Sequence, residues 1–510
     1  MASPGVNAQL HTILFYYQYR SVLSERTKGN TMMNVPTDCY IGGRWQPAAD
    51  GATFTVLDPA TGAGIAEVAD GTAADGLQAL TAASGAAPRW AGTPARERAD
   101  LLAAAYREVV ARTEEFAAVI TAEMGKPLAE SRGEVHYAAQ FLRWFAEQTV
   151  RISGEVRTTP EADARILTLQ QPVGPSLLIA PWNFPLAMIT RKIGPALAAG
   201  CTVVVKPAEE APLAALLLTR VLHDVGVAPG VVNVVPTGRP ADLSSALLAD
   251  TRLRKVSFTG STPVGRILLA GAAANVVRTS MELGGNSAFV VFDDADLDSA
   301  VDGVMLAKFR NGGQSCVAAN RILVQDGIAE AFTDRVLQRV RAMRTGPGTE
   351  PGVDLGPMIN ARQRQRVHRL VTDAIDDGAR ARCGAELPQG PGFFYPPTVL
   401  TDVPAGSRIA REEIFGPVLA ISTFDTEEQA VAASNDTEYG LVDYLFTNDL
   451  RRTFRVAETL QAGMIGINRG LVSNAAAPFG GVKQSGLGRE GGFEGIREYL
   501  EVKYLALDKG

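Results

Sequence analysis

Two short apolar runs, Leu177-Leu178-Ile179-Ala180 and Thr202-Val203-Val204-Val205, decide the fold that we expect for this chain. Each run has the length and the aliphatic content of a buried strand. Similar runs follow at 231–235 and 255–258, and helical patterns such as 211–225 lie between the runs. Strands that alternate with helices predict βαβ units around a mostly parallel sheet.

The same alternation begins again after Gly284-Gly285. Residues 287–292 have the pattern of a strand, and residues 296–309 have the pattern of a helix. Further strands are expected at 322–324, 418–421 and 464–467. We therefore predict an α/β protein with two domains and a boundary near residue 284.

The segments before the first apolar run are of several kinds. Residues 1–31 are polar and poorly patterned, and we expect them to be a disordered extension. A hairpin with a tight glycine turn is predicted at 40–45, because two glycines separate two short strand-like segments. Helical periodicity predicts one helix over 94–124 and a second over 130–150.

Two segments fit neither domain well. Residues 151–172 and 499–507 have the alternating pattern of exposed strands. Such strands can pair between subunits, or they can form an ordinary hairpin within one subunit.

Composition excludes several classes of protein. The 510 residues are 46% hydrophobic and 20% charged, with a net charge of −6, which is typical of a soluble globular protein and gives no support to nucleic acid or a membrane as partner. No apolar run reaches the 18 residues of a membrane span. The four cysteines are far apart and the four histidines form no HExxH pattern, so we expect no metal site and a reduced, cytoplasmic location.

The first candidate for chemistry is Cys316, which follows the glycine turn Gly312-Gly313. Backbone N–H groups in such a turn can stabilise a thiolate and a developing oxyanion. Taken alone the signal is weak, because a single cysteine is more often an inert buried residue. Glu282, just before Gly284-Gly285, is a candidate general base, although a salt-bridged surface glutamate fits the same pattern.

Polar residues follow three of the predicted strands, at the edge where ligands bind in open α/β sheets. Asn183 lies between two prolines and can donate its side-chain N–H to an oxyanion. Lys206 and Glu209 suit the hydroxyls of a ribose, and Ser261 at the start of a helix suits a pyrophosphate. Because the GxGxxG pattern is absent, these residues alone are weak indications of a dinucleotide.

Taken together, the motifs and their order resemble those of the aldehyde dehydrogenase superfamily. The motifs are Pro181–Pro185, Lys206–Glu209, Phe258–Ser261, Glu282–Gly285, Gly313–Cys316, Glu412–Pro417 and Pro478–Gly486. They extend the resemblance over roughly residues 36–507. Each motif is short, but so many in the right order make coincidence implausible.

The resemblance implies an aldehyde dehydrogenase-like fold with two Rossmann-like α/β domains and a small β oligomerisation element. Residues 32–149 and 173–284 would form the NAD-binding domain, and residues 285–490 the catalytic domain. The oligomerisation strands would lie in 150–172 and 491–510. The family also implies a homodimer or a homotetramer.

The resemblance also implies the chemistry. Cys316 would attack the aldehyde carbon, Asn183 would hold the oxyanion, and Glu282 would activate the water that releases the acid. Glu490 would assist proton movement behind Glu282. The residues expected to bind NAD or NADP are Trp182, Lys206, Glu209, Gly260, Ser261, Gly265, Glu413 and Phe415.

Within that family the chain is most similar to succinate-semialdehyde dehydrogenases. By this resemblance Arg191, Arg310 and Ser473 would hold the far carboxylate of the substrate, as guanidinium groups can. Glu209 would repel a 2′-phosphate, so NAD is expected to be preferred and NADP is the alternative. Ala318 stands where many relatives carry a second cysteine, and we therefore expect no redox-switch disulfide.

Two other functions fit parts of the sequence. Another semialdehyde, such as glutarate semialdehyde, or a broad range of aldehydes would use the same chemistry. A non-catalytic structural protein on this fold would be expected to lack the nucleophile or the base, whereas Cys316, Glu282 and Asn183 are all present.

Overall fold

The structure, a computed structural model, describes residues 34–508. The predicted extension at 1–31 lies outside the described residues. From residue 36 to residue 508 the chain forms one unit, which contains both of the large sheets described below. Within the described part, no helix is long and apolar enough to cross a membrane, and no three potential metal ligands gather in one place.

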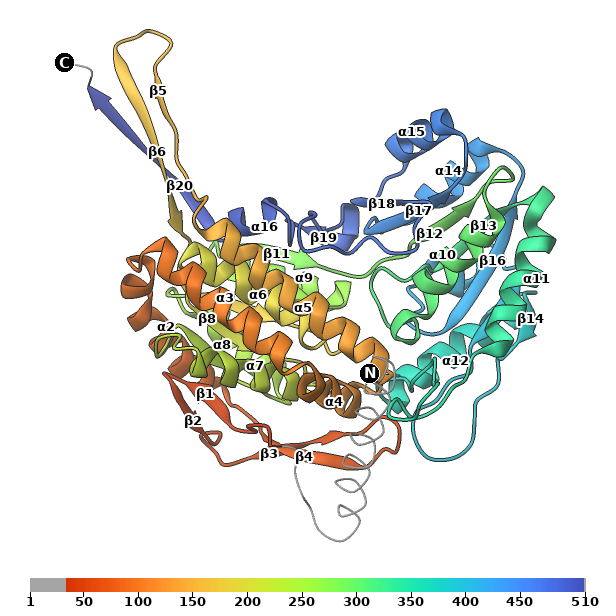
Figure 1. Cartoon of the computed structure of the whole chain (residues 1–510), viewed down its shortest axis with the longest axis horizontal. Coiled ribbons are helices and arrows are strands. Elements are labelled where there is room, and N and C mark those ends of the chain that lie inside the picture. Colours follow the sequence, from red (N-terminus) through yellow and green to blue (C-terminus); the bar gives the residue numbers. More distant parts are fainter. Residues whose placement is uncertain (1–33, 509–510) are drawn as a thin grey trace, which may run out of the picture. The chain divides into compact units, whose positions relative to one another are not determined.

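An eight-stranded sheet is the centre of the first α/β domain (Figure 1). Its strands, in spatial order, are β19 (Gly486–Leu487), β11 (Arg278–Glu282), β10 (Lys255–Thr259), β7 (Ser176–Ile179), β8 (Val203–Lys206), β9 (Val232–Val234), β1 (Cys39–Ile41) and β2 (Arg44–Gln46). The five strands from β11 to β9 are parallel. The chain proceeds from β7 through β8 to β9 on one side and later from β10 to β11 on the other. The direction of winding therefore reverses between β7 and β10.

Eight helices belong to this part of the chain. They are α2 (Ala73–Ala91), α3 (Ala95–Ala111), α4 (Thr113–Met124), α5 (Leu128–Thr149), α6 (Ala187–Ala199), α7 (Leu213–Asp224), α8 (Pro240–Ala249) and α9 (Thr262–Ala273). α2 begins at a capping box in which Thr72 and Asp75 satisfy each other's backbone N–H groups. α4 and α6 end at Gly125 and Gly200, both in the left-handed conformation that glycine adopts without strain.

The second domain has a seven-stranded sheet. Its strands, in spatial order, are β14 (Arg380–Cys383), β15 (Thr398–Thr401), β16 (Val418–Phe424), β13 (Arg321–Gln325), β12 (Ala288–Val291), β17 (Val442–Phe446) and β18 (Met464–Ile467). Only β14 is antiparallel to its neighbour. The helices are α10 (Leu297–Phe309), η2 (Arg310–Gly313), α11 (Asp326–Ala342), α12 (Ala361–Asp376), α13 (Arg408–Arg411), α14 (Glu427–Asn435) and α15 (Leu450–Thr459). Further along the chain, η3 (Lys483–Ser485) and α16 (Glu494–Arg497) flank the short strand β19.

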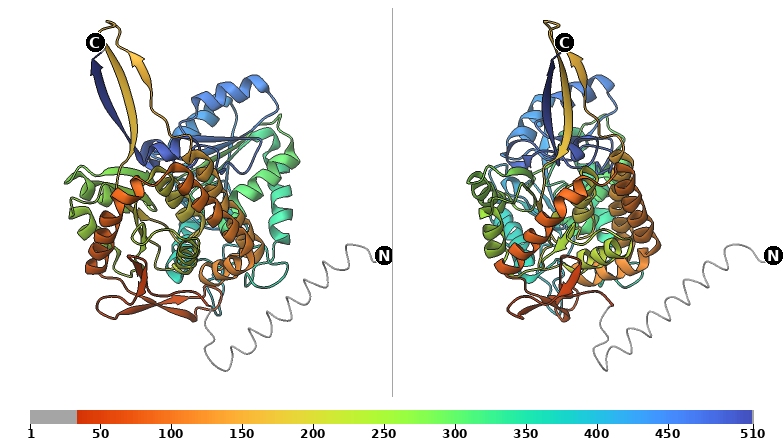
Figure 2. Two further views of the ribbon diagram at one scale, coloured as in Figure 1. Left: turned by 60° about the vertical axis from the view of Figure 1, so that its left-hand side comes forward. Right: turned by 90° about the vertical axis from the view of Figure 1, so that its left-hand side faces the viewer.

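Two smaller sheets complete the fold. β3 (Thr53–Leu57) pairs with β4 (Gly64–Ala69). β20 (Leu500–Asp508) runs antiparallel to β6 (Ala164–Pro172) over its whole length, and β6 also pairs with β5 (Val156–Thr158). This three-stranded sheet extends away from the two domains (Figure 2). The two strand-like segments outside the domains thus pair with each other within one chain.

The sequence predicted most strands of the two large sheets but few of the helices. The hairpin of β1 and β2 is confirmed, and Gly42 and Gly43 at its turn both have positive φ. The single helix expected over 94–124 is wrong, because the chain forms α3 and α4 with a break at Arg112. At the break the Thr113 hydroxyl donates to the Val110 carbonyl at 2.7 Å, a local bond that competes with the helical ladder.

Candidate active site

Loops from both sheets meet at the candidate active site. The loop after β7 contains Asn183 and the loop after β10 contains Ser261, so both lie at the point where the winding of the first sheet reverses. Ligands of open α/β sheets bind at such a point. Cys316 and Phe415 come from loops that lead into β13 and β16 of the second sheet. The site is therefore built from carboxyl ends of one sheet and amino ends of the other.

The loop that carries Cys316 has an unusual backbone. Asn311, Gly312 and Gly313 all have positive φ. A Cβ on Gly313 would lie 2.2 Å from the carbonyl oxygen of Gly416, so only glycine fits there. Burial raises the pKa of the Cys316 thiol to about 12, while the positive charge of Arg191 lowers it. The thiol in this state is protonated near neutral pH and needs an acceptor for its proton.

Glu282 is a candidate for that acceptor. It ends β11, is 2% exposed, and neither carboxylate oxygen has a hydrogen-bond partner among the described residues. Burial and the nearby charge of Glu490 raise its pKa well above the ordinary value. A buried carboxyl group without partners is costly to keep, and a raised pKa suits a general base near neutral pH.

Asn183 is held by several hydrogen bonds. Its side-chain oxygen accepts from the Phe184 N–H at 3.1 Å, and its Nδ2 donates to the carbonyl of Gln314 at 3.1 Å. The NH₂ group has two hydrogens, so one N–H remains for another acceptor. Gln314 is two residues before Cys316, so this hydrogen bond joins the Asn183 amide to the loop of Cys316.

Glu490 lies in a buried polar cluster. Lys192 donates to its Oε1 at 2.6 Å and to the Ser257 hydroxyl at 3.0 Å. The other oxygen of Glu490 has no hydrogen bond, and Arg191 Nη1 is 3.6 Å from it. Because the charge of Glu490 also raises the pKa of Glu282, the two carboxyl groups are electrostatically linked.

The residues expected to bind a dinucleotide line one side of the site. Lys206 Nζ is 2.9 Å from Glu209, and Thr259 at the end of β10 has a buried hydroxyl without a partner. Ser261 begins α9 but makes no capping bond, which leaves the helix N-terminus free for an anion. A Cβ on Gly265 would lie 2.5 Å from Leu283, so this glycine allows α9 to pack closely.

The other expected cofactor residues lie beside them. The rings of Trp182 and Phe415 meet edge to face with centroids 5.4 Å apart. Burial raises the pKa of Glu413 to about 7, and the Gly285 N–H donates to it at 3.3 Å. A Cβ on Gly260 would strike the Phe258 ring at 2.4 Å. The unpaired hydroxyl, the free helix end and the carboxylates fit a nucleotide with ribose hydroxyls and a pyrophosphate.

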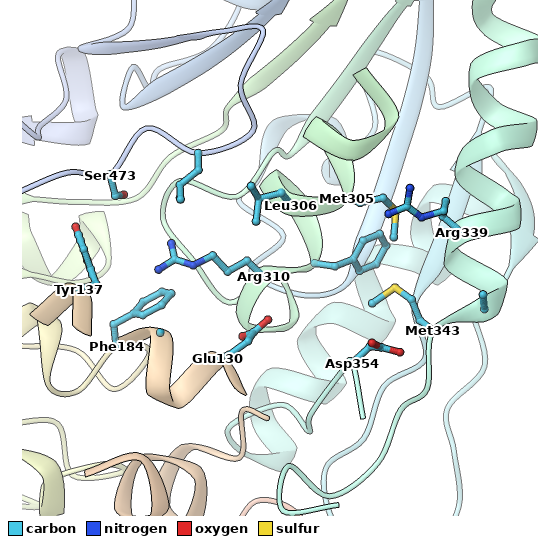
Figure 3. Close-up of a pocket in the computed structure, with 14 residues that line it drawn as sticks. Glu130, Tyr137, Phe184, Met305, Leu306, Arg310, Arg339, Met343, Asp354 and Ser473 are labelled. Carbon is cyan, nitrogen blue, oxygen red and sulfur yellow. The ribbon is translucent and has the colours of Figure 1, made fainter. Parts of the chain in front are cut away.

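A cavity of about 720 Å³ opens between α5 and α10 (Figure 3). Arg310 extends across it with its guanidinium toward Tyr137 and Phe184. Ser473 also lines the cavity. Arg310 stacks 4.7 Å from the centre of the Phe184 ring. It forms no ion pair or side-chain hydrogen bond with any residue between 34 and 508. An unpaired guanidinium at a cavity wall is suited to a carboxylate ligand.

Arg191 is placed differently from Arg310. It is 2% exposed and does not line this cavity. Its guanidinium lies 4.1 Å from the centre of the Phe479 ring and donates to the hydroxyl of Tyr137, which does line the cavity. Nε and Nη1 of Arg191 have no hydrogen-bond partner in the described part of the chain. The two arginines therefore do not share one wall in this structure.

Sequence reasoning missed the residues that support the site. Lys126 and Glu134 contact the loop of Asn183, and Gln363 and Arg366 contact the loop of Phe415. None of them belongs to a motif in which chemistry is obvious from residue type. Lys126 stands between a helix-ending glycine and a proline, and nothing else in the sequence indicates that it contacts the site.

The fold and the site define an NAD(P)-dependent oxidoreductase that acts through a cysteine. The sequence pattern of the Aldehyde dehydrogenase family matches residues 45–505, and the chain belongs to this family. A succinate-semialdehyde dehydrogenase of Paenarthrobacter nicotinovorans is 54% identical over 87% of this chain and 98% of its own length. A glutarate-semialdehyde dehydrogenase of Pseudomonas putida is 46% identical over 92% and 97%. A solved succinate-semialdehyde dehydrogenase from Burkholderia pseudomallei superposes with a TM-score of 0.92 at 46% identity, covering 94% of this chain and 100% of that one.

Proposed function

We propose that this enzyme oxidises succinate semialdehyde to succinate, with NAD⁺ preferred over NADP⁺. Cys316 gives its proton to Glu282 and attacks the aldehyde carbon. The free N–H of Asn183 and the backbone N–H of Cys316 stabilise the oxyanion. A nicotinamide bound beside Cys316 would supply the acceptor for the hydride, and loss of that hydride from the carbon would leave a thioester on Cys316. Glu282 then takes a proton from water, which attacks the thioester and releases the acid.

The supporting groups have separate roles in this proposal. Glu490, with Lys192, receives the proton from Glu282. Trp182, Lys206, Glu209, Gly260, Ser261, Gly265, Glu413 and Phe415 bind the dinucleotide. We assign cofactor binding to residues 32–149 and 173–284 and catalysis to residues 285–490. The protein acts in the cytoplasm as a homodimer or homotetramer, through the strands in 150–172 and 491–510.

The unpaired Arg310 in the cavity is the observation that carries the choice of substrate. A carboxylate at the far end of the aldehyde gives this guanidinium a partner, and Ser473 adds a hydroxyl donor. Arg191 does not line the cavity and supports the carboxylate through Tyr137, whose hydroxyl accepts from the Arg191 guanidinium. Hydrogen bonds to charged groups contribute roughly 1.5–3 kcal/mol, which corresponds to about 10- to 150-fold in kcat/KM.

Reduction of NAD⁺ at 340 nm tests this choice with succinate semialdehyde and butanal as substrates. Arg310→Met should lower kcat/KM for succinate semialdehyde about 10- to 150-fold and change that for butanal by less than about threefold. Arg339→Met is the matched control, because Arg339 lines the same cavity but already pairs with Asp302 at 2.6 Å. Equal losses on both substrates would remove the carboxylate role of Arg310.

Glutarate semialdehyde is the second candidate substrate. The Pseudomonas putida relative is named for it, and the cavity continues past Arg310 along apolar residues such as Met305 and Met343. One more methylene is worth only about 1–3 kcal/mol in an apolar pocket. Comparing kcat/KM for the two semialdehydes decides which is preferred.

Glu209 carries the proposed cofactor preference. Its carboxylate, paired with Lys206 at 2.9 Å, would accept hydrogen bonds from ribose hydroxyls and repel a 2′-phosphate. Glu209→Ser should therefore raise kcat/KM with NADP⁺ by about tenfold or more, since a like-charge contact is removed and Lys206 is released. A wild-type enzyme with higher kcat/KM for NADP⁺ would contradict the preference.

A further inference from the structure

Lys126 is a buried lysine at the corner between α4 and α5. Its residue is 2% exposed, and its Nζ lies 2.5 Å from Glu134 and 2.8 Å from the backbone carbonyl of Asn183. The ammonium also lies 3.9 Å from the centre of the Phe184 ring. Removing an ammonium from water is energetically unfavourable, so a lysine in this place needs compensating contacts. Apart from the ion pair with Glu134, these contacts are to the loop that contains Asn183.

Glu134 connects the lysine to the far end of the same loop. Its Oε1 accepts from the N–H groups of Leu186 at 3.0 Å and Ala187 at 3.2 Å, at the start of α6. Its other oxygen binds Lys126. The ion pair therefore holds the loop at Asn183 and again at the first turn of α6.

The Asn183 carbonyl joins this ion pair to the loop of the nucleophile. It accepts a second hydrogen bond from Asn311 Nδ2 at 2.9 Å. Asn311 Nδ2 also donates to the Gln314 carbonyl at 3.0 Å, and that carbonyl is the acceptor for the side chain of Asn183. A connected set of hydrogen bonds thus runs from Lys126 to the side-chain amide of Asn183.

We infer that Lys126 is a positioning residue for the oxyanion donor: its ammonium fixes the Asn183 backbone so that the side-chain N–H is directed at the reacting oxygen. This inference rests on the proposed role of Asn183. Lys126 does not touch the substrate. Its contribution to the rate passes through Asn183, because an oxyanion donor acts only when it is held in place before the charge develops.

A double-mutant cycle between Lys126 and Asn183 tests the inference. Lys126→Met should lower kcat for succinate semialdehyde about 10- to 100-fold in the wild-type background, a part of the loss caused by removing an oxyanion donor. In the Asn183→Ala background the same change should cost less than about twofold, since the group that it positions is gone. The rate at which iodoacetamide alkylates Cys316 should stay within about twofold in all four proteins, because the loop of the nucleophile keeps its own glycine geometry.

Glu123→Gln is the matched control. Glu123 is a buried carboxylate on α4 whose hydrogen bonds go to the N–H groups of Leu213 and Ala214 at the start of α7 and not to the loop of Asn183. Its substitution should lower the melting temperature and leave kcat unchanged. If Lys126→Met does not fold, Lys126→Met with Glu134→Gln removes both charges together and carries the cycle instead.

The outcomes separate the two proposals. Equal losses from the Lys126 substitution with and without Asn183 would show a general structural effect and overturn the positioning role alone. A Lys126→Met enzyme with full kcat would overturn it as well. Full activity of Asn183→Ala would overturn the oxyanion role of Asn183 and, with it, the role of Lys126.

Discussion

Cys316 shows how single charges set the reactivity of the site. Burial raises the pKa of its thiol to about 12, and Arg191 is the positive charge that opposes this increase. The thiolate is the reactive form, so a higher thiol pKa means a smaller reactive fraction at any pH below it. Besides its proposed role toward the substrate, Arg191 therefore has a second effect. It increases the fraction of Cys316 that is thiolate in the free enzyme.

Alkylation of the free enzyme by iodoacetamide measures this effect. The rate should rise about tenfold per pH unit between pH 7 and pH 10, because the thiol is mostly protonated throughout that range. Arg191→Met should raise the pKa further and slow alkylation several-fold at each pH, while Arg310→Met should leave the rate unchanged. Faster alkylation in Arg191→Met would contradict the assignment.

At the scale of elements, α12 holds the loop that presents Phe415. Phe415 has a positive φ of 54°, a conformation that a bulky residue keeps only when its surroundings impose it. Gln363 donates to the Phe415 carbonyl at 3.0 Å, and Arg366 donates to the carbonyls of Ile414 at 3.1 Å and Glu413 at 2.8 Å. The helix thereby fixes the backbone of two proposed cofactor residues.

Arg366→Met should weaken cofactor binding. Loss of two charge-assisted hydrogen bonds removes roughly 1.5–3 kcal/mol from the ordered loop, so KM for NAD⁺ should rise about 10-fold or more. The KM for the semialdehyde should change little, since α12 does not line the substrate cavity. A titration with NAD⁺, followed by protein fluorescence, measures the affinity for the cofactor. Arg369→Met is the control, because Arg369 is an exposed residue on the same helix. An unchanged affinity for NAD⁺ in Arg366→Met would show that the loop does not depend on α12.

The sequence predicted the strands whose residues are mostly apolar. The apolar strands β7, β8, β12 and β16 were predicted because they are buried on both faces. β11 and β17 were missed, because Ser280, Glu282 and Asp443 interrupt their apolar pattern although all three are buried. Asp443 accepts from the Ala288 N–H at 2.7 Å, a tertiary contact that no local pattern can indicate.

For the candidate site too, the sequence predicted some residues and missed others. Motifs identified residues whose type suggests chemistry, such as Cys316, whereas Lys126 and Arg366 act through backbone carbonyls that any residue provides. Their partners are 57 and 47 positions away along the chain. Only the folded chain brings such groups together, so a single sequence contains no signal for them.

At the scale of the whole molecule, the candidate active site is built from both large sheets. The first sheet supplies Asn183, Ser261 and Glu282 at its carboxyl ends, and the second supplies the loops of Cys316 and Phe415 at its amino ends. β19 returns from the second part of the chain and pairs with β11 beside Glu282. A change that loosens this pairing would move the proposed base relative to the nucleophile.

The three-stranded sheet of β5, β6 and β20 argues for assembly of several chains. Val502 and Tyr504 on β20 are 64% and 58% exposed, and Val156 on β5 is 69% exposed. Two outer strands with exposed apolar residues favour association, because an uncovered strand edge readily finds a partner.

Val502→Asp with Tyr504→Asp should therefore lower the molar mass measured by light scattering to that of a smaller species. Leu57→Asp, at an exposed position of β3 far from this sheet, should leave the mass unchanged (Figure 1). A wild-type protein that is monomeric at micromolar concentration would contradict the proposed assembly, and a double variant that keeps the full mass would place the contact elsewhere on the molecule.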